Sequence, residues 1–154
     1  MSILNVNSLR TTTIQHTNGT TAQTIDSSGR VFRPNQPAVR ATSSTLSGDR
    51  WISYSAEYNI GSNFDVSTGI FTCPLTGVYI ISALYSSTSG VVERNIGHLW
   101  INNVIQGEWV ESYGAFDDTT GIQLRRLNTN DTIQIGVNTG FIYNIVALQI
   151  YFLG

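Results

Sequence analysis

Apolar and polar residues alternate with a period of two over much of the chain. In TIQIGV, residues 132–137, and in NIVALQIYFLG, residues 144–154, apolar side chains recur at every second position. This period is typical of a β-strand that buries one face. Gly and Asn interrupt the pattern about every ten positions, and apolar residues do not recur with helical spacing over the length of a helix. The pattern predicts an all-β fold, an antiparallel two-sheet sandwich or jelly roll.

One predicted strand, within FDVSTGIFTCPLTGVYIISALY (residues 64–85), is apolar on both faces. Val78, Ile80 and Leu84 point one way, and we expect them to cover the core of the chain itself. The opposite set would then form an outer patch that is too apolar for the surface of a monomer. That outward set consists of Tyr79, Ile81, Ala83 and Tyr85.

The composition changes near residues 33–38, RPNQPA. The preceding segment is almost free of aromatic residues and has too few apolar residues to form a core. Within it, TIQHTNGTTAQTI predicts a hairpin around Asn18-Gly19, a dipeptide favoured in tight turns. We therefore expect an extended N-terminal arm over residues 1–35 and a globular head over residues 36–154. Because a lone hairpin is marginal in water, the arm is disordered, intertwined with its own copies, or docked on a partner.

The composition excludes several classes of function. Only 12% of the 154 residues are charged, the net charge is −2, and all eight basic residues are arginine. Such a chain lacks the basic patch of a nucleic-acid-binding protein. Apolar runs are too short to span a bilayer, so membrane insertion is not expected, and the first residues show no secretory signal.

Candidate chemistry is sparse. Cys73 is the single cysteine and lies in an apolar run, which predicts a buried, inert thiol. His16 and His98 are far apart in sequence and belong to no nucleophile or metal motif. We therefore expect no enzyme activity and no cofactor. Asp117 and Asp118 are a weak calcium candidate because they offer hard oxygen ligands, although a solvated loop explains them as well.

The segment YNIGSNFDVSTGIFTCPLTGVYIISA, residues 58–83, resembles the central signature of the C1q/TNF-like superfamily. Further segments follow the strand order of that family, and together they cover about three quarters of the chain. Val39 replaces the usual Phe, the last strand lacks the usual Phe-x-Gly-Phe, and no collagen-like stalk precedes the head. The residues that carry the central motif are Phe64, Gly69, Phe71, Pro74, Gly77 and Val78.

The resemblance implies a homotrimeric jelly roll in which the strand around residue 80 and the C-terminal strand line a threefold axis. Neighbouring chains would then cover the second apolar face. It also implies a calcium site near the axis as one alternative use of the aspartate pair. The interface residues expected on this basis are Tyr79, Ile81, Ala83, Tyr85, Ala147 and Tyr151.

The N-terminal segment is similar to segments that precede C1q-like heads in structural proteins of tailed bacteriophages. This similarity implies a non-enzymatic virion protein, assembled in the host cytoplasm, that decorates the capsid or forms a head fibre. The arm would bind the major capsid protein or another virion protein. Two alternatives stay open: a tail-fibre tip that binds a host surface receptor, and a cytokine-like secreted ligand. The apolar residues available for attachment are Leu4, Val6, Leu9, Ile14 and Ile25.

Overall fold

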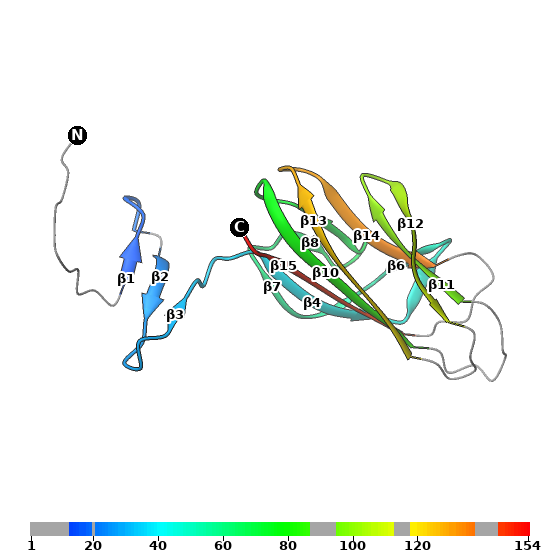
Figure 1. Ribbon diagram of the computed structural model, residues 1–154, viewed down its shortest axis with the longest axis horizontal. Coiled ribbons are helices and arrows are strands. Elements are labelled where there is room, and N and C mark those ends of the chain that lie inside the picture. Colours follow the sequence, from blue (N-terminus) through cyan, green and yellow to red (C-terminus); the bar gives the residue numbers. More distant parts are fainter. Residues whose placement is uncertain (1–12, 20, 87–94, 113–117, 138–144) are drawn as a thin grey trace. The chain divides into compact units, whose positions relative to one another are not determined.

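The computed structural model describes residues 13–19, 21–86, 95–112, 118–137 and 145–154, and these ranges contain strands and turns without a helix (Figure 1). Strand pairing is antiparallel throughout these ranges, which confirms the predicted all-β fold. The part of the chain that is described holds no helix with the length and hydropathy of a membrane span. The chain divides into two compact units, Met1–Gln36 and Pro37–Gly154.

The first unit contains one small sheet with the order β1-β2-β3, formed by Thr13–Gln15, Thr21–Ile25 and Val31–Phe32. The predicted hairpin is present. Gly19 lies in the turn with φ +84°, and its N–H donates to the carbonyl of His16 at 2.9 Å. A positive φ is unstrained in glycine, which explains the Asn-Gly pair at this place.

The second unit is a two-sheet sandwich (Figure 1). One sheet has the order β13-β10-β15-β4-β7, and we call it the five-stranded sheet. The other has the order β12-β11-β14-β6-β5, with β9 beside β14 and β8 beside β9. The strands of this unit are β4 (Ala38–Ser43), β5 (Thr45–Ser47), β6 (Arg50–Ile52), β7 (Ser55–Ile60), β8 (Phe64–Asp65), β9 (Ile70–Thr72), β10 (Gly77–Ser86), β11 (Asn95–Ile101), β12 (Val104–Ser112), β13 (Asp118–Leu127), β14 (Thr132–Val137) and β15 (Ile145–Phe152).

The core lies between the two sheets. Ile133 and Ile135 of β14 face it from one side, and Val146, Leu148 and Ile150 of β15 face it from the other, all with no exposed area. The alternation in the sequence therefore placed both strands correctly. At roughly 1.5–3 kcal/mol for each large apolar side chain, this set contributes a substantial part of the stability of the head.

Strand β10 has the opposite orientation to the one expected. Its inward set is Tyr79, Ile81, Ala83 and Tyr85, each with no exposed area, and all four belong to the core of the single chain. The set expected inside, Val78, Ile80 and Leu84, is the set that points outward. Side chains alternate between the two faces of a strand. Assigning the wrong face to the core therefore gives the wrong orientation to every residue of β10.

The two buried tyrosines fit the core because their hydroxyls reach backbone carbonyls. Tyr79 Oη donates to the Leu75 carbonyl at 2.7 Å, and Tyr85 Oη donates to the Gly136 carbonyl at 3.2 Å. A buried hydroxyl without a partner would cost several kcal/mol, so these bonds decide that the rings can lie inside. Gly97 provides the space, because a Cβ there would lie 2.6 Å from Cζ of Tyr85.

Residues 58–83, which carry the family-like motif and are called the signature segment below, contribute several aromatic rings and glycines to the packing of the sandwich. Phe64 and Phe71 pair across β8 and β9, and the Phe71 ring lies edge-on to Tyr79 with centroids 6.0 Å apart. Gly69 and Gly77 allow close approach, since a Cβ at Gly77 would lie 2.5 Å from the Phe152 ring. Pro74 is half-buried beside them. The spacing of the motif thus reflects packing rather than chemistry.

The β13–β14 loop is held by the carboxylate of Asp131. The side-chain amide of Asn102 donates to it at 2.8 Å, and the backbone N–H of Asn128 donates at 2.7 Å. These hydrogen bonds, that from Asn102 above all, hold the pKa of the Asp131 carboxyl below its ordinary value of 3.8. Asn102 and Asn103 form the β11–β12 turn with φ of 50° and 64°, as a tight hairpin requires.

We expect acid to weaken this loop in a way that depends on Asp131. A lowered pKa in the folded state stabilises the fold above the unfolded pKa near 3.8, and the contribution disappears as the pH falls through the lower native value. The melting temperature of the wild type should therefore decline more steeply than that of Asp131→Asn between about pH 4 and pH 2. Circular dichroism melts at matched concentration measure this difference. Identical pH profiles would show that the carboxylate does not support the loop.

Candidate self-association surface

Apolar side chains cover the outer face of strands β10 and β13. Register places Leu124 beside Ile80 and Ile122 beside Ser82, on the side of the sheet away from the core. Ile122 and Leu124 are each 62% exposed, and Leu84 is 38% exposed. Exposed Ile and Leu side chains on neighbouring strands form a contiguous patch, and a monomeric protein rarely presents one of this kind.

Strand β15 extends the patch on the other side of β10. Tyr151 lies beside Ile80 and Ala147 beside Leu84 in the register, and both are half-buried. The hydroxyl of Tyr151 meets that of Tyr58 from β7, and the two rings lie 6.3 Å apart. Partial desolvation and this hydrogen bond raise the pKa of Tyr58 to about 12. We call the surface formed by Val78, Ile80, Leu84, Ile122, Leu124, Ala147 and Tyr151 the outer apolar face.

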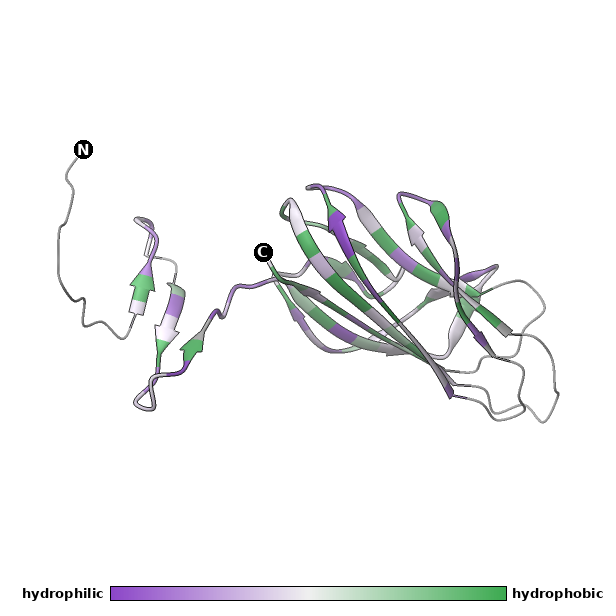
Figure 2. Ribbon diagram, viewed as in Figure 1, coloured by the Kyte–Doolittle hydropathy of each residue, from purple (hydrophilic) through white to green (hydrophobic). Residues whose placement is uncertain are grey.

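Among the described residues, charged side chains lie at the margins of this face. Asp118 begins β13 and Arg126 is near its end, while the ion pair of Arg40 and Glu57, 3.1 Å apart, lies on β4 and β7. The described outward side chains of β10 and β15 are apolar or neutral, with Ser82 and Gln149 paired at the middle. Figure 2 shows hydrophobic colour along both strands. A neutral centre with a charged rim is the usual anatomy of a protein–protein interface.

The outer face of the sheet that contains β11 has its large aromatic side chain covered by a charged one. Trp100 of β11 is covered by the guanidinium of Arg50, which lies 3.3 Å from the ring centroid, and Arg50 also donates to Asn103 at 2.8 Å. The exposed apolar residues Val104 and Ile105 sit at the tip of the β11–β12 hairpin, away from a larger patch. Among the described residues, the outer apolar face therefore groups exposed Ile and Leu side chains on neighbouring strands in a way that the outer face of the other sheet does not.

The interface expected from the sequence is corrected in four of its six residues. Tyr79, Ile81, Ala83 and Tyr85 are enclosed within the single chain and cannot contact a second one. Ala147 and Tyr151 do lie on the outward side of β15, and their role in an interface stays a prediction. Residues that the expectation omitted are Ile122 and Leu124. The sequence GIQLRRL contains the information needed to find them. Ile122, Leu124 and Arg126 are two residues apart, so in a strand they point to the same side, and the arginine marks that side as outward.

The other candidates do not converge on a reactive site. His16 lies in the β1–β2 turn and His98 on β11, where its Nδ1 is 3.3 Å from the Gly107 carbonyl. Asp117 lies outside the described residues, and Asp118 is exposed at the start of β13. Within the described ranges, three or more His, Cys, Asp or Glu side chains do not gather as metal ligands would. The weak calcium site therefore receives no support from these residues.

Cys73 is fully buried, as the sequence predicted. Burial, with the nearby Asp131 carboxylate, raises the pKa of its thiol to about 12. Since the thiolate is the reactive form, the folded protein should not react with a chromogenic disulfide reagent at about pH 8. The thiol should become fully reactive in denaturant. Rapid labelling of the native protein would show that Cys73 is accessible.

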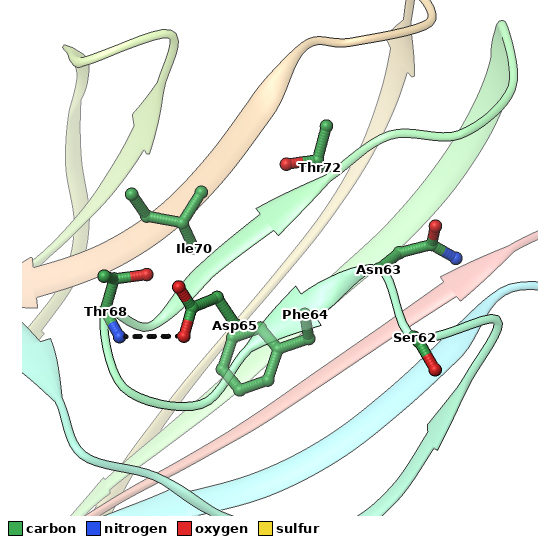
Figure 3. A pocket seen from close by; sticks show the side chains of 7 residues that line it. All are labelled: Ser62, Asn63, Phe64, Asp65, Thr68, Ile70 and Thr72. Carbon is green, nitrogen blue, oxygen red and sulfur yellow. Dashed lines mark hydrogen bonds between the residues drawn. The ribbon is translucent and has the colours of Figure 1, made fainter.

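A polar depression of about 420 Å³ lies beside the signature segment, lined by residues that include Asn63, Asp65 and Thr72 (Figure 3). The Asp65 carboxylate accepts hydrogen bonds from residues of its own loop. It accepts from the Ser67 N–H at 2.8 Å and from the Ser67 hydroxyl at 2.6 Å, and these bonds lower its pKa. We therefore assign Asp65 to the loop and not to ligand binding.

The antiparallel two-sheet sandwich has the architecture of a jelly-roll head, and one of its sheets carries an apolar outer face. The sequence matches the C1q domain over residues 38–154, which is most of the chain. The chain belongs to the C1q domain family. Among curated proteins, no sequence matches it.

Solved structures with the same fold include the globular domain of zebrafish complement 1qA protein. It superposes with a TM-score of 0.62 at 17% identity, over 77% of this chain and 98% of that one. The structure of murine APRIL at pH 5.0 gives a TM-score of 0.60 at 12% identity, over 77% of this chain and 99% of that one. At these identities the likeness shows the fold, and it confirms the predicted C1q/TNF-like jelly roll.

Proposed function

We propose that the chain is a non-enzymatic structural protein that forms a homotrimer through the outer apolar face. The observation that carries this proposal is the exposure of Ile122 and Leu124, each 62%, beside the outward residues of β10. Membership of the C1q domain family supports it, because the family resemblance implies trimeric heads whose β10 and β15 equivalents line the axis.

Burial of the outer apolar face between chains offsets the free-energy cost of association. An obligate interface commonly buries about 2,000 Å² or more and resembles a core cut in half. Apolar area contributes roughly 25 cal/mol per Å², from which the lost rotational and translational freedom must be subtracted. Neutral residues at the centre, Ser82 and Gln149, add no charge repulsion between three identical copies.

The mass of the full chain in solution tests the trimer. Analytical ultracentrifugation or light scattering at micromolar concentration should give three times the mass of the 16.9 kDa chain. A stable species of one chain at that concentration would overturn the proposal. A dimer would also overturn it, because the symmetry would then differ from the threefold arrangement.

We further propose that this trimer is a surface component of a tailed-phage particle, either a capsid decoration protein or a head fibre. The head would face solvent, and residues 1–35 would bind the major capsid protein or another virion protein. The low charge, the absence of lysine and the phage-like N-terminal sequence support this role. A decoration protein that binds only assembled shells would stabilise them by mass action.

Cryo-electron microscopy of purified particles tests the location. Density for a trimeric head on the shell supports the decoration role. Density at the end of the tail would instead support the receptor-binding tip. Absence of the chain from particles that are otherwise complete would overturn both virion roles.

A further inference from the structure

Within the described part of the first unit, the three-stranded sheet has one side on which apolar side chains are partly or largely exposed. Register pairs Ile14 with Gln23 and Ile25 with Val31, so three apolar side chains, Ile14, Ile25 and Val31, share one side with the neutral Gln23. Ile14 is 43% exposed and Val31 is 56% exposed. Figure 2 marks all three strands with hydrophobic colour. We call the side formed by Ile14, Ile25 and Val31 the arm face.

A sheet of this size requires something to cover the arm face. Its strands are three, five and two residues long, and its regular hydrogen bonds alone do not stabilise such a sheet in water. Independent stability requires that a hydrophobic face be removed from water. The Asp26–Arg30 ion pair, 2.7 Å long, shapes the β2–β3 connection, and its Arg30 side chain is 72% exposed.

The character of the arm face favours a copy of itself over another protein. The three strands contain no charged residue, so identical copies can meet around a threefold axis without like-charge repulsion. Only residues 33–37 separate β3 from β4. A trimeric head would therefore hold three arm sheets at an effective concentration of about millimolar, which makes their association effectively intramolecular.

We propose that the arm faces of three chains pack against one another, so that Ile14, Ile25 and Val31 from each chain form a second, smaller trimer contact. This proposal rests on the trimer proposed for the head and assigns the partner of the arm. The attachment role of the arm then falls to Leu4, Val6 and Leu9, which lie outside the described residues.

Cysteine cross-linking of the full chain tests the contact. Cys73 is buried, so a new surface cysteine is the reactive thiol. Val31→Cys on the arm face should cross-link between chains with a short flexible bismaleimide, whose reach tolerates separations longer than a disulfide allows. Thr24→Cys is the matched control, since Thr24 lies in the same sheet on the opposite side. Covalent dimers with Val31→Cys and single chains with Thr24→Cys are the expected result.

Hydrogen exchange provides the second measurement. The β2 amides should exchange at least about tenfold faster when the head is dissociated by Leu124→Asp, a substitution remote in sequence from the arm. Equal exchange in the trimer and in the dissociated head would overturn the proposal, and so would equal cross-linking of the two cysteine variants. If the wild type is a trimer and either of these results is obtained, only the arm contact fails. If the wild type is a single chain, the proposed function fails as well.

Discussion

Leu124→Asp should convert the trimer into single folded chains. Leu124 is 62% exposed in one chain and lies on the edge strand β13, beside Ile80 of the outer apolar face. In the trimer, the aspartate would lose much of its hydration among apolar side chains, at a cost of several kcal/mol for each copy. A cost of about 4 kcal/mol corresponds to a roughly thousand-fold loss of affinity. Ultracentrifugation at micromolar concentration measures the shift in mass.

The matched control is Val104→Asp. Val104 is 60% exposed, almost equal to Leu124, but it sits on the β11–β12 hairpin of the other sheet. This variant should remain a trimer. Circular dichroism of Leu124→Asp should keep its β-sheet spectrum, since the side chain makes no core contact. A trimeric Leu124→Asp protein would exclude this face as the interface, whereas dissociation of both variants would indicate a general effect of added charge.

Gly69→Ala should be among the most destabilising single-methyl additions in the head. Gly69 has φ +72°, and a Cβ there would lie 2.3 Å from the Trp51 carbonyl oxygen and 2.7 Å from Cε2 of Tyr54. Backbone strain and a clash with a backbone atom act together, so we expect a loss of about 3 kcal/mol or more. For a chain of this length, the melting temperature should fall by about 6–12 °C.

Gly48→Ala separates the strain from the clash. Gly48 also has a positive φ, +61°, but a Cβ there would meet nothing within 4 Å. Its cost should be near 1 kcal/mol, or about 2–4 °C. Thermal melts at equal protein concentration compare the two variants, because association makes the melting temperature depend on concentration. Equal losses would mean that the neighbourhood of Trp51 yields to the added methyl group.

The sequence predicted the strands well wherever one face was apolar and the other was polar. Ile133 and Ile135 alternate with Thr132 and Gln134, and burial follows that alternation. It failed at β10, where both faces are apolar and the period of two cannot say which is buried. A weak signal was present, because Ser82 and Ser86 share the parity of Val78 and Ile80 and so mark the outward side. The polar hydroxyl of tyrosine favours an interface in the sequence pattern, but Tyr79 and Tyr85 donate to backbone carbonyls inside the core.

The candidate surface was harder to predict than the fold, because it depends on which strands are neighbours. Ile122 and Leu124 become part of one patch with Ile80 only through the pairing of β13 with β10. Strand neighbours far apart in sequence are set by the packing of the whole sandwich, which local periodicity does not contain. The turn at Asn102 and Asn103 is different, because the two asparagines alone favour the positive φ angles that the turn requires.

The C-terminus of the chain is built into the sheet. The carbonyl of Gly154 accepts from the Val78 N–H at 2.8 Å, the Leu153 N–H donates to the Val78 carbonyl at 2.8 Å, and the Phe152 N–H donates to the Pro37 carbonyl at 3.0 Å. Cargo genetically fused after Gly154 would thus emerge next to the residue where the head begins. Since Leu153 is 51% exposed, a peptide displayed in this way would start at the solvent-facing end of β15, beside Pro37.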